Sequence, residues 1–199
     1  MIHQPASLRI LLLTLIVAIF WNSFASAAPL APHRQCARLS KRTGYTLLGW
    51  KGLRAGLDAK AYERHPTTSG GGELGDVLYI ADGTDLARSF AHTHICEIYA
   101  DTTEWHHMPK AWVSQAQIHQ RVGPHTFPGA ALFASHTAAG VHGDASPWQL
   151  GIRGSDIGRI GLVAKCYPLN NPCTAPGLKI HYDQLSASWS IHGKPDRGH

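Results

Sequence analysis

A short hydrophobic run occupies the stretch 77–81, which lies between Gly75 and an Asp-Gly pair. A β-branched and aromatic run bounded by turn-forming residues is typical of a buried strand. Thr84 follows as a candidate helix N-cap, and apolar residues then recur at helical spacing as far as Ala91. The pattern therefore predicts a strand, a tight turn and a short amphipathic helix.

Similar short apolar segments occur on both sides of this unit. We expect further strands at 45–50, 95–99, 148–152, 160–167 and 189–191, and short helices at 53–63 and 110–120. The glycine-rich stretch 66–72 is typical of a loop, and 124–143 has no assignable period. Many short strands with a few short helices indicate an α+β fold built on antiparallel sheets.

The first residues of the chain have the pattern of a secretory signal peptide. Arg9 precedes an apolar core at 10–20, and small residues at positions 25 and 27 fit a signal-peptidase site. This core is too short to span a bilayer, which needs about 18 apolar residues or more. We therefore expect residues 1–27 to be removed and residues 28–199 to form a single secreted domain without a membrane anchor.

The charge of the expected mature domain gives little reason to predict a nucleic-acid partner. Without Arg9, the 18 basic residues become 17 against 13 acidic ones, a balance of +4. These charges are scattered along the sequence, as on a solvated surface, and do not form a long basic cluster. A domain of about 170 residues is large enough to bury one core, and we expect a monomer.

All four cysteines lie after the predicted signal peptide, and an even number in a secreted chain indicates disulfides. Four cysteines allow three pairings. Cys166 and Cys173 flank a turn-forming Pro and Asn segment, which favours a local bond between them. That choice leaves Cys36 paired with Cys96, and we expect the fold to be stapled by Cys36–Cys96 and Cys166–Cys173.

The segment 72–91 resembles the second motif of the diphtheria-toxin-like and PARP-like ADP-ribosyltransferases. In that family a strand tyrosine is followed eleven residues later by an aromatic residue of an alanine-rich helix, and Tyr79 and Phe90 have this spacing here. Upstream, Trp50, Lys51 and Gly52 fall where the family carries an aromatic-His-Gly-Thr motif that binds NAD. The two motifs occur in the family's order over roughly the first half of the mature chain.

This resemblance implies a fold and a binding mode. The family fold has two packed, mainly antiparallel β-sheets with a cleft between them for NAD, which serves as co-substrate. By the resemblance, Tyr79 and Phe90 would enclose the nicotinamide ring, and Trp50, Lys51 and Gly52 would contact NAD. Aromatic stacking of this kind contributes about 0.5–1.5 kcal/mol beyond burial of the ring.

Two positions depart from the family's pattern. Lys51 stands where the family has a histidine, and its ammonium has donors but no acceptor and repels a positively charged nicotinamide. The family's catalytic glutamate comes from a strand in the C-terminal third, but no glutamate follows Glu104. Asp183, next to an Ile-His-Tyr segment, is the expected substitute, although its side chain is one methylene shorter.

The fourteen histidines suggest no metal site. His92 and His94 are two residues apart and His106 and His107 are adjacent, spacings that match no helical metal-binding motif. No C-x-x-C pair is present to indicate zinc. We expect no bound metal.

The resemblance leads to two functional hypotheses. The first is a secreted, toxin-like effector that modifies a host protein by NAD-dependent mono-ADP-ribosylation, outside or inside the host cell. The second is an effector that keeps the fold, has lost catalysis and binds a host protein. Intact NAD chemistry would favour the first, and the missing glutamate favours the second, because a shared fold alone does not establish an activity.

Overall fold

A computed structural model describes residues 44–120, 127–136 and 147–197 of the chain. The expected signal peptide, its cleavage site and Cys36 lie outside the described residues, as does half of the unassigned stretch 124–143.

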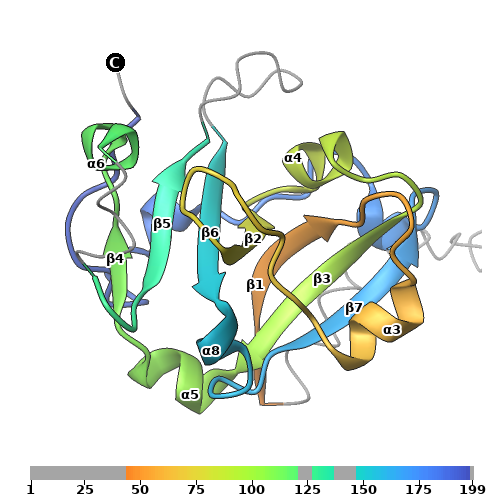
Figure 1. The fold of residues 1–199 in the computed structure, drawn as a ribbon, viewed down its shortest axis with the longest axis horizontal. Helices are drawn as coiled ribbons and strands as arrows, with labels where there is room; N and C mark the ends of the chain where they lie inside the picture. The colour runs from red at the N-terminus through yellow and green to blue at the C-terminus, as the bar shows by residue number, and fades with distance from the viewer. Residues whose placement is uncertain (1–43, 121–126, 137–146, 198–199) are drawn as a thin grey trace, which may run out of the picture. The chain divides into compact units, whose positions relative to one another are not determined.

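The described residues have an α+β fold with one mostly antiparallel sheet of seven strands, in the order β4-β5-β6-β2-β1-β3-β7 (Figure 1). Only the β4–β5 pairing among them is parallel. The strands are β1 (Tyr45–Gly52), β2 (Val77–Ala81), β3 (His94–Asp101), β4 (Lys110–Trp112), β5 (Ala131–Ser135), β6 (Trp148–Arg153) and β7 (Val163–Pro168). The helices are α3 (Ala59–Arg64), α4 (Thr84–Ser89), α5 (Thr102–His107), α6 (Gln115–His119), α8 (Gly154–Ile157), α9 (Tyr182–Leu185) and the 3₁₀ turn η1 (Pro172–Thr174).

The strands form one sheet where two packed sheets were expected, but the sheet is nearly divided at its middle. β1 pairs with β2 only through Trp50 and Ala81, whereas β1 pairs with β3 over most of its length and β2 pairs with β6 over all five of its residues. β1 and β2 diverge away from that pair (Figure 1). The half β4-β5-β6-β2 and the half β1-β3-β7 are therefore joined by a narrow seam.

The predicted strand–turn–helix unit is present as β2 and α4, with one local difference. The helix does begin at Thr84, but its N-cap is Gly83 and Thr84 does not cap it. Instead, the Thr84 hydroxyl donates to the carbonyl oxygen of Ala175 at 2.7 Å. The threonine therefore ties the helix start to the C-terminal segment and is not used in a local cap.

Two predicted elements in the second half of the chain are wrong. The stretch 110–120, predicted as one helix, is divided into β4 and α6, because the backbone N–H groups of Trp112 and Val113 donate to His192 and Phe133 far away in the sequence. Residues 189–191 form a turn with no strand. Trp189 packs instead against other buried aromatic rings of the core: Trp105, Phe133 and Tyr182.

Both predicted disulfide pairings are wrong. Cys96 bonds to Cys166, which stands directly opposite it in the antiparallel β3–β7 pair. Cys173 is also disulfide-bonded, so it is not paired with Cys166. The pairing follows from strand register, which places Cys96 and Cys166 face to face, and not from the turn between Cys166 and Cys173.

No helix among the described residues is long and apolar enough to cross a membrane.

Candidate functional site

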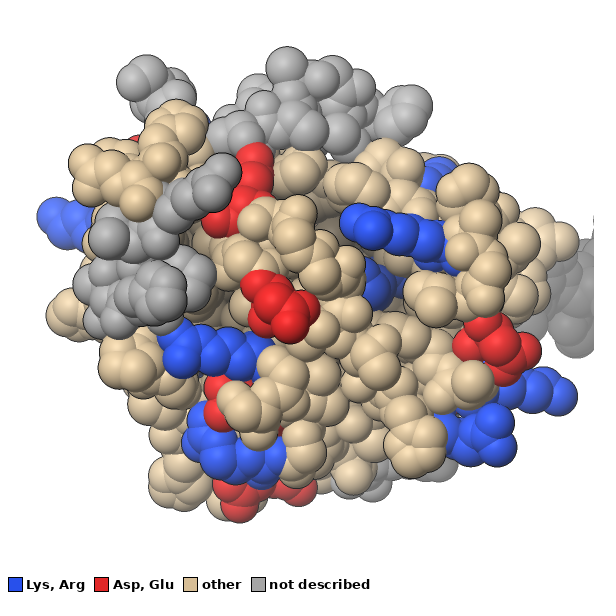
Figure 2. Space-filling view, in the orientation of Figure 1, with Lys and Arg blue, Asp and Glu red and all other residues tan. Residues whose placement is uncertain are grey.

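A cavity opens where β1 and β2 diverge at the seam, beside α4. All five residues that the sequence assigned to NAD line it: Trp50, Lys51, Gly52, Tyr79 and Phe90. Figure 2 shows this face of the molecule hollowed, with Lys and Arg side chains beside the hollow. The structure thus brings residues from two separate parts of the chain into one cavity.

Two glycines place the β1 residues at the cavity. The register of β1 against β3 shifts between Leu47 and Gly49, and Gly49 has a φ of +146° that favours glycine. At Gly52 a Cβ would lie 2.1 Å from the carbonyl oxygen of Ala87 in α4. β1 therefore bends at Gly49 and contacts the α4 backbone at Gly52, which holds Trp50 and Lys51 between these two points.

The two aromatic residues are held in different ways. The Tyr79 hydroxyl accepts from the backbone N–H of Leu74 at 2.7 Å and donates to the carbonyl oxygen of Gly75 at 3.0 Å. Burial raises the pKa of Tyr79 to about 12. Phe90 follows α4 and is 44% exposed, and its ring centroid lies 5.8 Å from that of the His136 ring, with the two ring planes at 73°. Tyr79 thus fixes a loop beside the cavity, whereas Phe90 is a partly exposed wall.

One side of the cavity is basic. Lys51 and Arg54 both line it, and the Lys51 ammonium donates to the Ser69 hydroxyl at 2.5 Å. Burial, and to a smaller extent the charge of Arg54, lowers the pKa of Lys51 to about 8. A half-buried Lys51 beside an exposed Arg54 favours an anionic ligand, because an anion would relieve the repulsion between the two cations.

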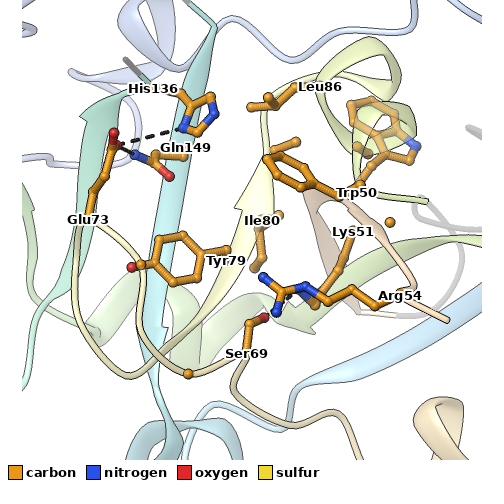
Figure 3. A pocket seen from close by; sticks show the side chains of 16 residues that line it. Trp50, Lys51, Arg54, Ser69, Glu73, Tyr79, Ile80, Leu86, His136 and Gln149 are labelled. Atoms are coloured by element: carbon orange, nitrogen blue, oxygen red, sulfur yellow. Dashed lines mark hydrogen bonds and ion pairs between the residues drawn. The ribbon is translucent and has the colours of Figure 1, made fainter. Parts of the chain in front are cut away.

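The opposite side carries an acid, an amide and an imidazole. Glu73 Oε2 accepts from Gln149 Nε2 at 2.6 Å and lies 3.7 Å from His136 Nδ1. In Figure 3 these three side chains lie together across the cavity from Lys51 and Arg54, with Tyr79 between the two groups. The cavity therefore has a negative end and a positive end.

Asp183, the expected catalytic carboxylate, is not among the residues that line this cavity. It lies in the first turn of α9, and its Oδ2 is 3.5 Å from Arg197 Nη2. The neighbouring Tyr182 is fully buried, and its hydroxyl donates to the Leu48 carbonyl oxygen. The structure therefore does not bring Asp183 together with the other predicted site residues.

Sequence reasoning missed the acidic side of the cavity. In the sequence, Gln149 gave one signal, because it is a polar residue inside a predicted strand of mostly apolar residues. In the structure its side chain is buried, with 4% exposed. Glu73 directly follows a glycine-rich loop, and His136 lies two residues after the apolar run 130–134. No local spacing relates these three residues, which come from different parts of the chain.

A second cavity adjoins the first. Lys51, Gly52, Arg54 and Ser69 line both, and the second is continued by Tyr62 and Thr67. The two cations therefore lie where the cavities meet. An elongated ligand with a central negative charge fits this arrangement.

Among the described residues, no group of three or more His, Cys, Asp or Glu side chains is placed to hold a metal ion. Comparison of the sequence with models of known protein families and with curated proteins gave no match.

Proposed function

We propose that this protein is a secreted effector with an ADP-ribosyltransferase-like fold, which binds NAD in the cavity at the seam and cleaves its nicotinamide–ribose bond. Transfer of the ADP-ribosyl group to a host protein, a mono-ADP-ribosylation, is the function that follows. NAD is the substrate in this proposal, and no other cofactor is needed.

The observation that carries the proposal is the convergence of Trp50, Lys51, Gly52, Tyr79 and Phe90 on one cavity. These residues were selected only by their match to two motifs, about 30 positions apart in the sequence. Aromatic residues beside a few polar groups are typical of a ligand pocket. The narrow β1–β2 seam also resembles the division between the two sheets of the family fold.

The charges of the cavity match those of NAD. The nicotinamide ring of NAD is positively charged and its pyrophosphate is negatively charged. With the ring beside Glu73 and the pyrophosphate beside Lys51 and Arg54, each charge would meet its opposite. Lys51 then serves as a phosphate-binding residue, and its departure from the family's histidine no longer places an ammonium against the nicotinamide.

The second hypothesis, a non-catalytic effector that binds a host protein, is favoured by one observation. The only residue that a C-terminal described strand contributes to the cavity is Gln149, an amide, whereas the resemblance implies a glutamate from a strand in this part of the chain. An amide cannot carry the negative charge that stabilises a ribosyl cation.

Titration of the oxidised, purified protein with NAD, followed by calorimetry and by release of nicotinamide, separates the two hypotheses. Binding with release establishes an enzyme. Binding without release indicates a retained cavity without chemistry. The absence of NAD binding contradicts the proposed function.

Replacing Phe90 by alanine is expected to weaken NAD binding about tenfold and to leave the protein folded. The ring is a cavity wall, so its loss removes stacking with the nicotinamide, while its 44% exposure limits its part in the core. Calorimetry measures the affinity, and thermal unfolding measures the stability. Val163→Ala, at a similarly exposed apolar position in β7 outside this cavity, is the matched control. If Phe90→Ala unfolds the protein, the residue belongs to the core and not to a nicotinamide slot.

The affinity for NAD is expected to be constant below about pH 8 and to fall as the pH rises above it. Lys51 has a pKa lowered to about 8, so it is a charged phosphate ligand below that pH and becomes neutral above it. Loss of a charged hydrogen bond corresponds to roughly a tenfold weaker affinity. The Lys51→Arg variant keeps its charge to much higher pH and should remove this dependence. An identical pH profile for both proteins would show that Lys51 does not bind the phosphates.

A further inference from the structure

Of the described residues that line the cavity, only Glu73 has a carboxylate side chain. It belongs to the loop that leads into β2, not to a strand of the C-terminal third. The C-terminal strand position that reaches the cavity holds Gln149, whose amide donates to Glu73 at 2.6 Å. A carboxylate and an amide therefore occupy the acidic end together, with the carboxylate supplied from an unexpected part of the chain.

The loop that carries Glu73 is fixed at short range. Gly72 and Gly75 form a β-bridge, and the Tyr79 hydroxyl bonds to the backbone of Leu74 and Gly75 on the C-terminal side of Glu73. A Cβ at Gly72 would lie 2.4 Å from the Tyr79 ring, so the loop backbone contacts that ring closely. The Glu73 carboxylate is therefore held through the backbone contacts of its neighbours as well as through its own side chain.

Gln149 is suited to hold this carboxylate without competing with it. It is 4% exposed and lies in β6, where it pairs with Ala81 of β2. Its side-chain amide donates to Glu73 Oε2 and leaves the negative charge in place. A second carboxylate at this position would repel Glu73 and favour its protonation.

His136 completes the group at the cavity wall. Its Nδ1 lies 3.7 Å from Glu73 Oε2, and its ring packs against the Phe90 ring in a T-shaped arrangement. Both ring nitrogens are buried without a hydrogen-bond partner among the described residues. A buried imidazole that is not used in a structural hydrogen bond, beside a carboxylate, is available to accept a proton.

We propose that Glu73 is the catalytic carboxylate of this site, that Gln149 is its positioning residue, and that His136 accepts the proton of an attacking water. This inference rests on the proposed function. It assigns to the isolated protein an NAD glycohydrolase reaction, in which water takes the place of the host protein's side chain.

The reaction balances without a further reactant. The bond between ribose C1′ and the nicotinamide nitrogen breaks, and neutral nicotinamide leaves with the electron pair. Glu73 stabilises the positive charge that develops on the ribose. The oxygen of water then bonds to C1′, and the proton that it loses passes to His136. The products are ADP-ribose, nicotinamide and one proton.

The test compares Glu73→Gln with Asp183→Asn in the full-length secreted protein. Glu73→Gln removes the charge and keeps the shape, so kcat for nicotinamide release is expected to fall about 100-fold or more. The affinity for NAD should fall by a much smaller factor, because only the charge beside the nicotinamide ring is lost. His136→Gln should lower kcat by a similar factor. Asp183→Asn, which lies outside the cavity, should leave both quantities unchanged.

Gln149→Met tests the positioning role, because methionine is of similar size and cannot donate to the carboxylate. We expect a fall in kcat of about tenfold with little change in KM, whereas a purely structural role would alter thermal stability and leave kcat of the folded protein unchanged.

The outcomes separate this inference from the proposed function. If the unchanged protein releases nicotinamide and Glu73→Gln does so at the same rate, Glu73 is not the carboxylate and the inference fails alone. Loss of release in Asp183→Asn only would assign the reaction to Asp183. Binding of NAD without release by the unchanged protein also overturns the inference, and no binding overturns the proposed function with it.

Discussion

Removal of the Cys96–Cys166 disulfide is expected to lower the free energy of unfolding by about 4 kcal/mol and the melting temperature by roughly 10 °C. The bond closes a loop with a sequence separation of 70, which includes α5, β4, β5 and β6. In the chain-entropy model the size of the loop determines how much the bond stabilises the folded state, because the bond lowers the conformational entropy of the unfolded chain. The β3–β7 ladder itself should persist in the folded variant, since its backbone pairing does not need the bond.

The double variant Cys96→Ala, Cys166→Ala in urea denaturation checks this expectation. Val163→Ala, at an exposed position in the same strand as Cys166, serves as the control. Its free energy of unfolding should fall by less than about 1 kcal/mol. A double variant that unfolds at nearly the same urea concentration as the unchanged protein would mean that its unfolded state is already compact.

Replacing Gly52 by alanine is expected to destabilise the protein by about 3 kcal/mol and to abolish NAD binding. The added methyl would lie 2.1 Å from the Ala87 carbonyl oxygen and 2.7 Å from the Ala91 backbone nitrogen. Both neighbours are backbone atoms, which cannot move as a side chain can. β1 and α4 would have to separate, and this movement would displace Lys51 in β1 and Phe90 after α4, which both line the cavity.

Gly158→Ala is the matched control for this change, because no atom lies within 4 Å of the position that its Cβ would occupy. Thermal unfolding and NAD calorimetry on both variants give the comparison. Unchanged stability and affinity in Gly52→Ala would show that β1 and α4 can separate at this contact at little cost.

The sequence predicted well those parts of the fold that depend on neighbouring residues. The run 77–81 is a strand because its own residues favour one, and the glycine and Asp-Gly pair at its ends stop it. The stretch 110–120 has helical spacing too, yet Lys110–Trp112 is drawn into the sheet by β5 and by the His192 carbonyl. Local pattern cannot reveal such pairing, because the partner is up to 80 residues away.

The candidate site also has one part that local sequence patterns predicted and one part that they did not. Tyr79, Phe90 and the Trp50 to Gly52 segment were found because each motif is contiguous or regularly spaced. The opposite wall was not predicted, because Glu73 and Gln149 are in contact but are separated by 76 residues in the sequence. The predicted disulfide pairing was wrong for a related reason. Cys96 bonds to Cys166 because the register of β3 against β7 places them opposite each other, and no turn-forming segment encodes that register.

The narrow seam gives a ligand a mechanical role. β1 and β2 share one register pair, so few backbone hydrogen bonds resist a change in the angle between the two halves of the sheet. A molecule in the cavity contacts Lys51 on one half and Tyr79 and Gln149 on the other. It would therefore restrict the movement of the two halves of the sheet relative to each other. Amide hydrogens on both sides of the seam should then exchange with solvent more slowly when the cavity is filled.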